Sequence, residues 1–311
     1  METRRKTNRI RQNVLPLLAA LIWGTAFVAQ SVSTDFLGPF TFNTARAVIA
    51  FAALSIILRL FPALSGGVPE KAPPDPKEAR KQLVLAGLCC GTLLTVASTL
   101  QQAALSETSV GKAGFITALY VVLVPVFRIF LRKRAPIQVW IGVVLAVAGL
   151  YLLCMKQESF TVERSDTLVL LCAVVFSFHI LCVDHFVQMV DGVRLSCAQF
   201  LTMTVLSGAG MLLFEEPAWA NILRCLPALL YVGVLSSGVA YTLQILAQKD
   251  ADPTVVSLLL SLESVFSVLA GAVILGDRLT AREYAGCVLM FAAVVLSQLP
   301  SPRYKKDAFS R

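Results

Sequence analysis

Long apolar runs alternate with short polar stretches along this chain of 311 residues, and ten of the runs approach the length of a bilayer-spanning helix. A helix needs about 20 apolar residues to cross the hydrocarbon layer. These runs are apolar on every face, whereas the strands of a membrane barrel alternate apolar and polar residues. The pattern therefore predicts an all-α integral membrane protein. Its ten predicted transmembrane helices are Leu15–Val32, Phe36–Leu60, Gln82–Leu105, Val110–Phe130, Ile137–Met155, Thr167–Gln188, Leu195–Phe214, Leu223–Gln248, Thr254–Leu275 and Ala281–Gln298.

The two halves of the chain carry the same pattern. Thr99-Leu100-Gln101 returns 143 residues later as Thr242-Leu243-Gln244, each time near the end of an apolar run. Carried onward without a gap, the same offset of 143 places Thr117–Tyr120 on Leu260–Glu263. The chain therefore contains one unit twice.

Other parts of the unit follow slightly different offsets. The first two spans of each copy are 153 residues apart, and the last spans are 144 apart. The first copy therefore has ten extra residues, and they fall in the stretch Leu60–Arg80, whose prolines and glycines are typical of a loop. These offsets pair Trp23 with Phe176, Arg46 with Gln199, Trp140 with Tyr284 and Gly142 with Gly286.

Each copy holds five predicted helices, an odd number, so the second copy enters the membrane from the opposite face. We therefore predict two inverted five-helix repeats, over residues 14–156 and 157–299, between a basic segment 1–13 and a tail 300–311. Inverted repeats are common in secondary transporters, whose substrate sites lie near the midplane where the repeats meet. The duplication therefore favours a transport function.

Composition and charge support a membrane location. Hydrophobic residues make up 57% of the chain and charged residues only 15%, against about 25% in soluble domains. With the N-terminus inside, twenty of the 27 lysines and arginines fall on the cytoplasmic side. Because cytoplasmic loops hold the excess of these residues, we expect both termini in the cytoplasm. The first span is long and leads directly into the second, so it is predicted to be an anchor and not a cleaved signal.

The net charge of +8 is then explained by topology, with contacts to anionic lipids as an addition. No basic stripe with interleaved aromatic residues occurs, so we expect no nucleic acid as a partner. The expected partners are a small-molecule substrate and the lipid bilayer. Gly142, Ala146 and Gly149 indicate close packing against another helix or against a second copy in a homodimer.

The chain resembles the EamA-type family of the drug/metabolite transporter superfamily over about residues 14–299. The residues that carry the resemblance, in chain order, are Trp23-Gly24-Thr25-Ala26-Phe27, Arg46, Thr108-Ser109-Val110-Gly111, Thr117-Ala118-Leu119-Tyr120, Pro125, Ser261-Leu262-Glu263 and Gly276-Asp277-Arg278-Leu279-Thr280. The resemblance implies a ten-helix carrier of small polar metabolites in the plasma membrane, often of amino acids or related compounds and often an exporter. Ser264 and Val121 or Val122 stand where many relatives have a proline, so we do not carry helix kinks over to this chain.

Two charged residues inside the predicted spans are the main candidates for substrate binding, because a charge near the bilayer centre costs at least about 2.5 to 3.5 kcal/mol. Arg46 is interpreted either as an anchor for an anion or carboxylate, or as part of a structural ion pair or backbone hydrogen bond. Glu263 is interpreted as an anchor for an amine, a proton carrier, or a partner of Arg46. If both faced one cavity, a zwitterion such as an amino acid would satisfy both charges.

Four further residues complete the predicted site. His179 lies within a span and is interpreted as a substrate contact, a proton relay or a buried hydrogen-bonded histidine. Trp23, Tyr120 and Tyr241 offer flat apolar faces with a polar group, for lining a cavity or for packing helices. Gln101 and Gln244, the repeated pair, are expected to cap backbone groups or to gate the pathway.

Two other function classes remain as alternatives to a carrier. One is a membrane-embedded enzyme that uses Arg46, His179 and Glu263 on a lipid-linked substrate, and the other is a receptor or channel. The chain has no Walker loop, HExxH pair or GxSxG motif, so we expect no cofactor, no metal and no enzymatic activity. The eight cysteines are scattered without CxxC spacing and are expected to act as small apolar residues.

Overall fold

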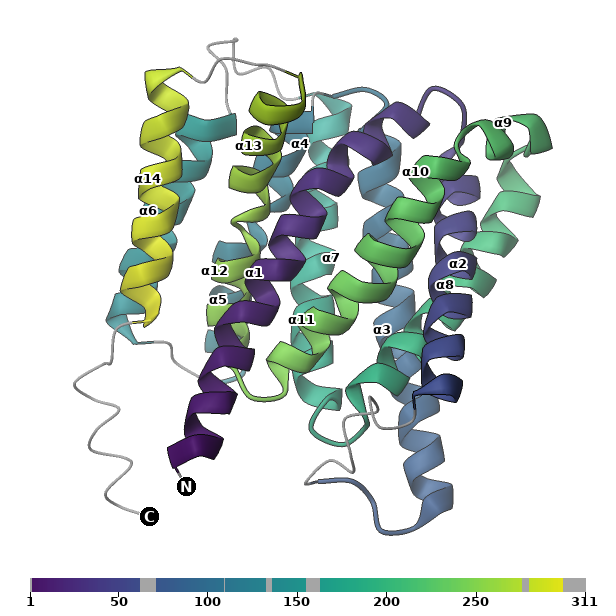
Figure 1. The fold of residues 1–311 in the computed structure, drawn as a ribbon, viewed down its shortest axis with the longest axis horizontal. Helices are drawn as coiled ribbons and strands as arrows, with labels where there is room; N and C mark the ends of the chain where they lie inside the picture. The colour runs from purple at the N-terminus through teal and green to yellow at the C-terminus, as the bar shows by residue number, and fades with distance from the viewer. Residues whose placement is uncertain are drawn as a thin grey trace.

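Every regular element in the described part of the chain is a helix (Figure 1). The computed structural model describes residues 2–61, 71–108, 110–132, 136–154, 163–275 and 280–298. Ser109 and the segment Gly276–Leu279 of the resemblance, as well as the predicted tail 300–311, lie outside these residues. The helices are α1 (Glu2–Ser33), α2 (Pro39–Leu60), α3 (Pro76–Ala104), α4 (Val110–Thr117), α5 (Tyr120–Phe130), α6 (Ile137–Cys154), α7 (Arg164–Phe186), α8 (Gly192–Phe214), α9 (Trp219–Arg224), α10 (Leu226–Leu230), the π-helix η2 (Tyr231–Ala240), α11 (Tyr241–Gln248), α12 (Pro253–Leu260), α13 (Glu263–Leu275) and α14 (Ala281–Gln298).

Eight helical stretches of the described residues are long and apolar enough to cross a membrane, and Ile137–Leu153 is a shorter apolar helix. The prediction of an all-helical protein with many apolar spans is confirmed. The first helix is longer than predicted, since α1 begins at Glu2 and not at Leu15. In Figure 1, α1 begins and α14 ends at the same end of the bundle.

Local sequence explains where several helices begin. Asp75, Asp191 and Asp252 precede α3, α8 and α12, and each carboxylate accepts a hydrogen bond from a backbone N–H of the first turn, at 2.9 to 3.0 Å. Such caps satisfy donors that have no partner within the helix. A proline follows Asp75 and Asp252, and its fixed φ suits the first helical position.

Two of the predicted spans are interrupted at equivalent positions. The span predicted over Val110–Phe130 breaks between α4 and α5, and the span predicted over Thr254–Leu275 breaks between α12 and α13. At each break one amide turns back to the carbonyl three residues earlier: Leu119 N–H to Ile116 at 3.2 Å, and Leu262 N–H to Leu259 at 3.3 Å. These two bonds are related by the offset of 143.

These two helices are therefore bent, although no kink was expected in them. Both bends form without the proline of relatives, through a tight turn of the i→i−3 type. At the second break the Ser261 hydroxyl also donates to the Leu258 carbonyl at 2.8 Å, a local bond that competes with the regular helix ladder. Non-helical backbone at membrane depth is tolerated where protein buries it, and Ser261 and Leu262 are fully buried.

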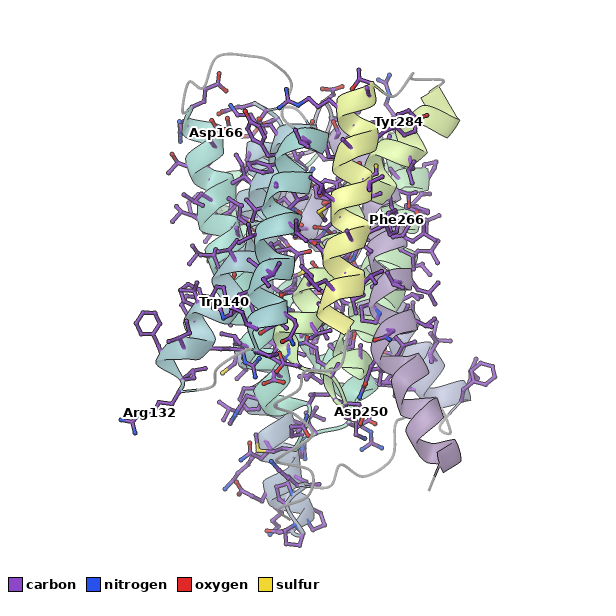
Figure 2. All side chains as sticks on the ribbon, turned by 90° about the vertical axis from the view of Figure 1, so that its left-hand side faces the viewer. Arg132, Trp140, Asp166, Asp250, Phe266 and Tyr284 are labelled. Carbon is purple, nitrogen blue, oxygen red and sulfur yellow. The ribbon has the colours of Figure 1, made fainter. Side chains whose placement is uncertain are left out.

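The helices α6 and α14 lie antiparallel in close contact. A Cβ added at Gly142 would lie 3.1 Å from the Ala293 carbonyl oxygen, and one at Gly149 would lie 2.9 Å from that of Gly286. The small residues of α6 therefore pack against α14 of the same chain, and Ala146 between them is fully buried. In Figure 2, Tyr284 at the start of α14 lies near the upper end of the bundle, and Trp140 near the start of α6 lies well below it.

The helices α2 and α8 are antiparallel as well. A Cβ at Gly208 would lie 3.8 Å from the Thr44 methyl group, while nearer the other end the Ser55 hydroxyl and the Cys197 sulfur are 3.5 Å apart. The offset of 153 converts Thr44 into Cys197 and Ser55 into Gly208. The two contacts are therefore the same contact with the two copies exchanged.

Candidate functional site

A narrow pocket of about 40 Å³ lies among the helices, with space for roughly three water molecules. Its wall comes from helices of both halves of the chain. The lining residues are Trp23, Phe27 and Gln30 of α1, Arg46 of α2, Gln101 of α3, Thr117 of α4, Tyr120 of α5, Phe176 and Ile180 of α7, Ser236 of η2, Tyr241 and Gln244 of α11, Leu260 of α12 and Glu263 of α13.

Most of this wall consists of equivalent residues from the two copies. Five pairs of lining residues are related by the offsets of 143 and 153 found in the sequence. The pocket therefore lies where matching surfaces of the two halves meet. The pairs are Trp23 with Phe176, Phe27 with Ile180, Gln101 with Gln244, Thr117 with Leu260, and Tyr120 with Glu263.

Arg46 brings a buried positive charge to the pocket. Its side chain is buried, and one guanidinium nitrogen, Nη1, donates to the Gln30 side-chain oxygen at 3.4 Å. The Nε group has no hydrogen-bond partner. In the described part of the chain, no carboxylate lies within 4.0 Å of the guanidinium. The structural ion pair considered for Arg46 is therefore not formed among these residues.

Glu263 brings a buried carboxylate to the same pocket. It is the first residue of α13, directly after the helix interruption, and its Oε1 accepts a hydrogen bond from the Tyr120 hydroxyl at 3.2 Å. No lysine, arginine or histidine of the described segments lies within 4.0 Å of it. Arg46 and Glu263 thus face one cavity without pairing with each other.

An aromatic pair forms another part of the wall. The rings of Trp23 and Tyr241 lie 4.7 Å apart at an angle of 58°, and the indole N–H donates to the Ser236 carbonyl oxygen at 3.1 Å. Ser236 belongs to the π-helix η2, whose wider turns shift the side chains that follow. Trp23 therefore both lines the pocket and joins α1 to η2, so the cavity and packing interpretations both apply.

The structure does not place His179 on the pocket wall. Its ring is fully buried behind Tyr241, with the two ring centroids 6.1 Å apart, and Nε2 shares a hydrogen bond of 3.1 Å with the Gln199 side chain. This geometry corresponds to the buried, hydrogen-bonded alternative. The residues required for the alternative enzyme, Arg46, His179 and Glu263, are therefore not gathered around one cavity.

Three glutamines of the wall were absent from the predicted site. Gln101 and Gln244 were expected to cap or gate, and their repetition at an offset of 143 was the available signal. Gln101 donates to the Thr117 hydroxyl at 3.3 Å, and Gln244 donates to the Gln248 side chain at 3.2 Å. Gln30 is a polar residue within the first apolar span, and its backbone oxygen accepts from the Gln102 side chain at 3.2 Å.

Ion pairs hold the interrupted helix α4/α5 at both of its ends. Near one end, Lys112 of α4 lies 2.8 Å from the Asp166 carboxylate at the start of α7. At the other end, Arg128 of α5 pairs with Asp252 and donates to the Thr254 hydroxyl at 2.9 Å. In Figure 2, Asp166 lies near the top of the bundle and Asp250 in its lower part.

These apolar helices define a multi-pass membrane protein, and they enclose a pocket whose lining includes Arg46 and Glu263. The EamA-like transporter family matches residues 12–155 and again residues 164–299, so the chain belongs to this family. The resemblance found in the sequence is thereby confirmed. Membership of this family indicates a transporter.

Similar proteins agree with this assignment. The chain is 30% identical over 286 residues to an "Uncharacterized transporter" of Archaeoglobus fulgidus, a match that covers 91% of this chain and 84% of that protein. It is 22% identical to the "Uncharacterized transporter YwfM" of Bacillus subtilis, over 94% of this chain and 95% of that one. A solved crystal structure shares the fold with a TM-score of 0.74 and 19% identity, over 94% of this chain and 98% of the other.

Proposed function

We propose that this protein is a secondary active transporter of small polar metabolites, namely amino acids or related compounds, and that it works as an exporter. The substrate binds in the pocket between Arg46 and Glu263. Access to this pocket alternates between the two sides of the membrane as the two halves move against each other.

The observation that carries the proposal is a basic group and an acidic group on one cavity, neither of which forms an ion pair within the described residues. Arg46 and Glu263 are 3% and 4% exposed, and neither meets an opposite charge among the described residues. Removing an ion from water costs several kcal/mol unless a counter-charge compensates it. A zwitterion supplies both counter-charges, with its carboxylate at Arg46 and its ammonium group at Glu263. The cavity of about 40 Å³ is too small for an amino acid, so it must widen as the two halves of the protein move apart.

An inverted repeat provides the two conformations that alternating access requires. The equivalent helices α2 and α8 are antiparallel, as are α6 and α14. Contacts also occur in exchanged pairs, because the offset of 144 converts the contact of Gly142 with Ala293 into that of Gly286 with Gly149. In Figure 1, α4 and α13 lie in the upper part of the bundle and α5 and α12 in the lower part. These relations support a two-fold axis in the membrane plane.

We include α6 and α14 as the remaining two of ten spans. Each has 18 residues, which at about 1.5 Å per residue gives about 27 Å, close to the hydrocarbon thickness. Ten spans place both termini on one side of the membrane, and the excess of lysine and arginine makes that side the cytoplasm. The plasma membrane is the proposed location. No second copy is needed to cover the glycine face of α6, since α14 already covers it.

The ion pairs at the two ends of α4/α5 support alternation. Lys112 with Asp166 and Arg128 with Asp252 connect this interrupted helix to α7 and to the start of α12. Opening one end of the pathway requires the ion pair at that end to separate while the ion pair at the other end remains formed. The interruptions near the pocket allow each half-helix to tilt separately.

Transport can be tested with purified protein in liposomes. The probe is a radiolabelled equimolar mixture of the twenty standard amino acids, measured by counterflow. We expect saturable exchange in the wild type. Arg46→Gln should raise the half-saturation concentration at least tenfold, because losing one partner of a buried charge pair costs about 2 to 5 kcal/mol.

Arg194→Gln is the matched control, because Arg194 is exposed at the start of α8 and should leave exchange unchanged. Full exchange by Arg46→Gln would contradict the proposed binding role, and absence of any flux in the wild type would contradict amino acids as substrates.

A further inference from the structure

We propose that Glu263 is the proton-binding site of this transporter, and that a proton and the cationic group of the substrate compete for its carboxylate. The inference rests on the proposed transport function and names the ion that drives it. One proton would therefore move in one direction for each substrate molecule that moves in the other.

Two positive partners can bind to the Glu263 carboxylate, namely a proton and the ammonium group of the substrate. The carboxylate is buried on the pocket wall, and the Tyr120 hydroxyl is its hydrogen-bond donor. A hydroxyl donor stabilises a carboxylate but does not neutralise it. An ionised carboxylate in an apolar interior is strongly disfavoured unless a positive group pairs with it. With the pocket empty, a proton satisfies this requirement; with the pocket filled, the ammonium group of the substrate does.

The other ionisable groups around Glu263 do not take this role. They are Arg46 of α2, Tyr120 of α5, Tyr241 of α11 and Cys172 of α7. The remaining lining residues, contributed by α1, α3, α4, α7, η2, α11 and α12, carry no group that ionises. Arg46 bears the positive charge, and its hydrogen bond goes to Gln30. The two tyrosines and the cysteine are uncharged weak acids that supply no cation.

The exchange step conserves protons and charge. In the empty pocket the Glu263 carboxyl group holds the proton in an O–H bond. When a zwitterion enters, this bond breaks and the proton passes to water on the side to which the pocket is open. The carboxylate then pairs with the substrate ammonium group, and Arg46 pairs with the substrate carboxylate. When the pocket opens to the other side, the substrate leaves and a proton from the water on that side binds to the Glu263 carboxylate.

The position of Glu263 also connects its charge to movement. Tyr120 and Glu263 are the first residues of α5 and α13, directly after the two helix interruptions. Their hydrogen bond joins the two interrupted helices at these points. A hydrogen bond to a carboxylate is about twice as strong as one between neutral groups. Binding or release of the proton therefore changes the strength of the connection between the two helices.

The first test requires no substrate. Wild-type protein in lipid nanodiscs is titrated between pH 5 and 9 while infrared spectroscopy follows the C=O band of protonated carboxyl groups. We expect a band that disappears as the pH rises, is missing in Glu263→Gln and returns in Glu263→Asp. Glu216→Gln, an equal change at an exposed residue after α8, should retain the band. A titrating band that persists unchanged in folded Glu263→Gln would overturn the proposal.

The second test measures coupling. Liposomes loaded with the mixture of twenty amino acids and a pH-sensitive dye are diluted into buffer without amino acids. Outflow through the wild type or Glu216→Gln should acidify the interior, whereas Glu263→Gln should give no more acidification than protein-free vesicles. Outflow without acidification in the wild type would overturn the proton site. If no amino acid moves but the infrared band depends on Glu263, the proposed substrate is wrong and the proton site stands.

Discussion

A single substitution, Gln30→Glu, tests whether Arg46 is kept available for a substrate anion. The Gln30 side-chain oxygen already lies 3.4 Å from Arg46 Nη1, so the new carboxylate would occupy the place of a bound anion. At 3.4 Å and an effective dielectric constant of about 20, two opposite charges attract by about 5 kcal/mol. Desolvation of the new carboxylate offsets several kcal/mol of this attraction. A net effect of about 1.4 to 3 kcal/mol remains, which corresponds to a ten- to hundredfold loss of substrate affinity.

The assay is counterflow of the labelled amino acid mixture in liposomes over a range of concentrations, with thermal unfolding of the same preparations. Gln30→Glu should raise the half-saturation concentration by the stated factor while the protein becomes no less stable, since the new ion pair satisfies Arg46. Gln82→Glu, the same chemical change on α3 away from the pocket, should leave both quantities as in the wild type. If Gln30→Glu transports with wild-type affinity, Arg46 does not bind the substrate anion.

Two further predictions concern the packing of the two halves. Gly149→Leu should destabilise the protein by about 1 to 3 kcal/mol in chemical unfolding, because its Cβ would lie 2.9 Å from the Gly286 carbonyl oxygen. Gly114→Ala is its control, since a Cβ there meets its nearest atom at 3.9 Å; equal stability of the two variants would refute the close contact. Ser55→Cys should form a disulfide with the native Cys197 on mild oxidation, because Ser55 Oγ and Cys197 Sγ are 3.5 Å apart. After proteolysis between the two halves, a non-reducing gel should show linked fragments; separate fragments would contradict the contact.

The sequence was sufficient to predict an all-helical protein with many apolar spans, but not how its helices are oriented around the pocket. Apolar length identifies a span, because any spanning helix must present apolar residues to lipid. Apolar length does not show which side of a helix faces the pocket, since lipid and the protein interior are both apolar. His179 was therefore placed in the site although it lies behind Tyr241, and Gln30 was left out although it lies on the wall.

Charge and aromatic character were both good guides, because Arg46, Glu263, Trp23, Tyr120 and Tyr241 all line the pocket. Arg46 and Glu263 were found because an ion within a span has few stable places other than a cavity. The helix interruptions were missed because a proline was taken as the signal for a bend. The equivalent backbone bonds of Leu119 and Leu262 form without a proline.

The hydrogen bond between Tyr120 and Glu263 joins two positions that the duplication made counterparts of each other. In a symmetric assembly of two identical single-unit chains, both places would hold the same amino acid. Two carboxylates would then face each other and repel, and two phenols would leave no carboxylate at all. Fusion of both units into one polypeptide removes this restriction. Because the two positions lie in one chain they can differ, and an acidic side chain, Glu263, meets a hydroxyl donor, Tyr120.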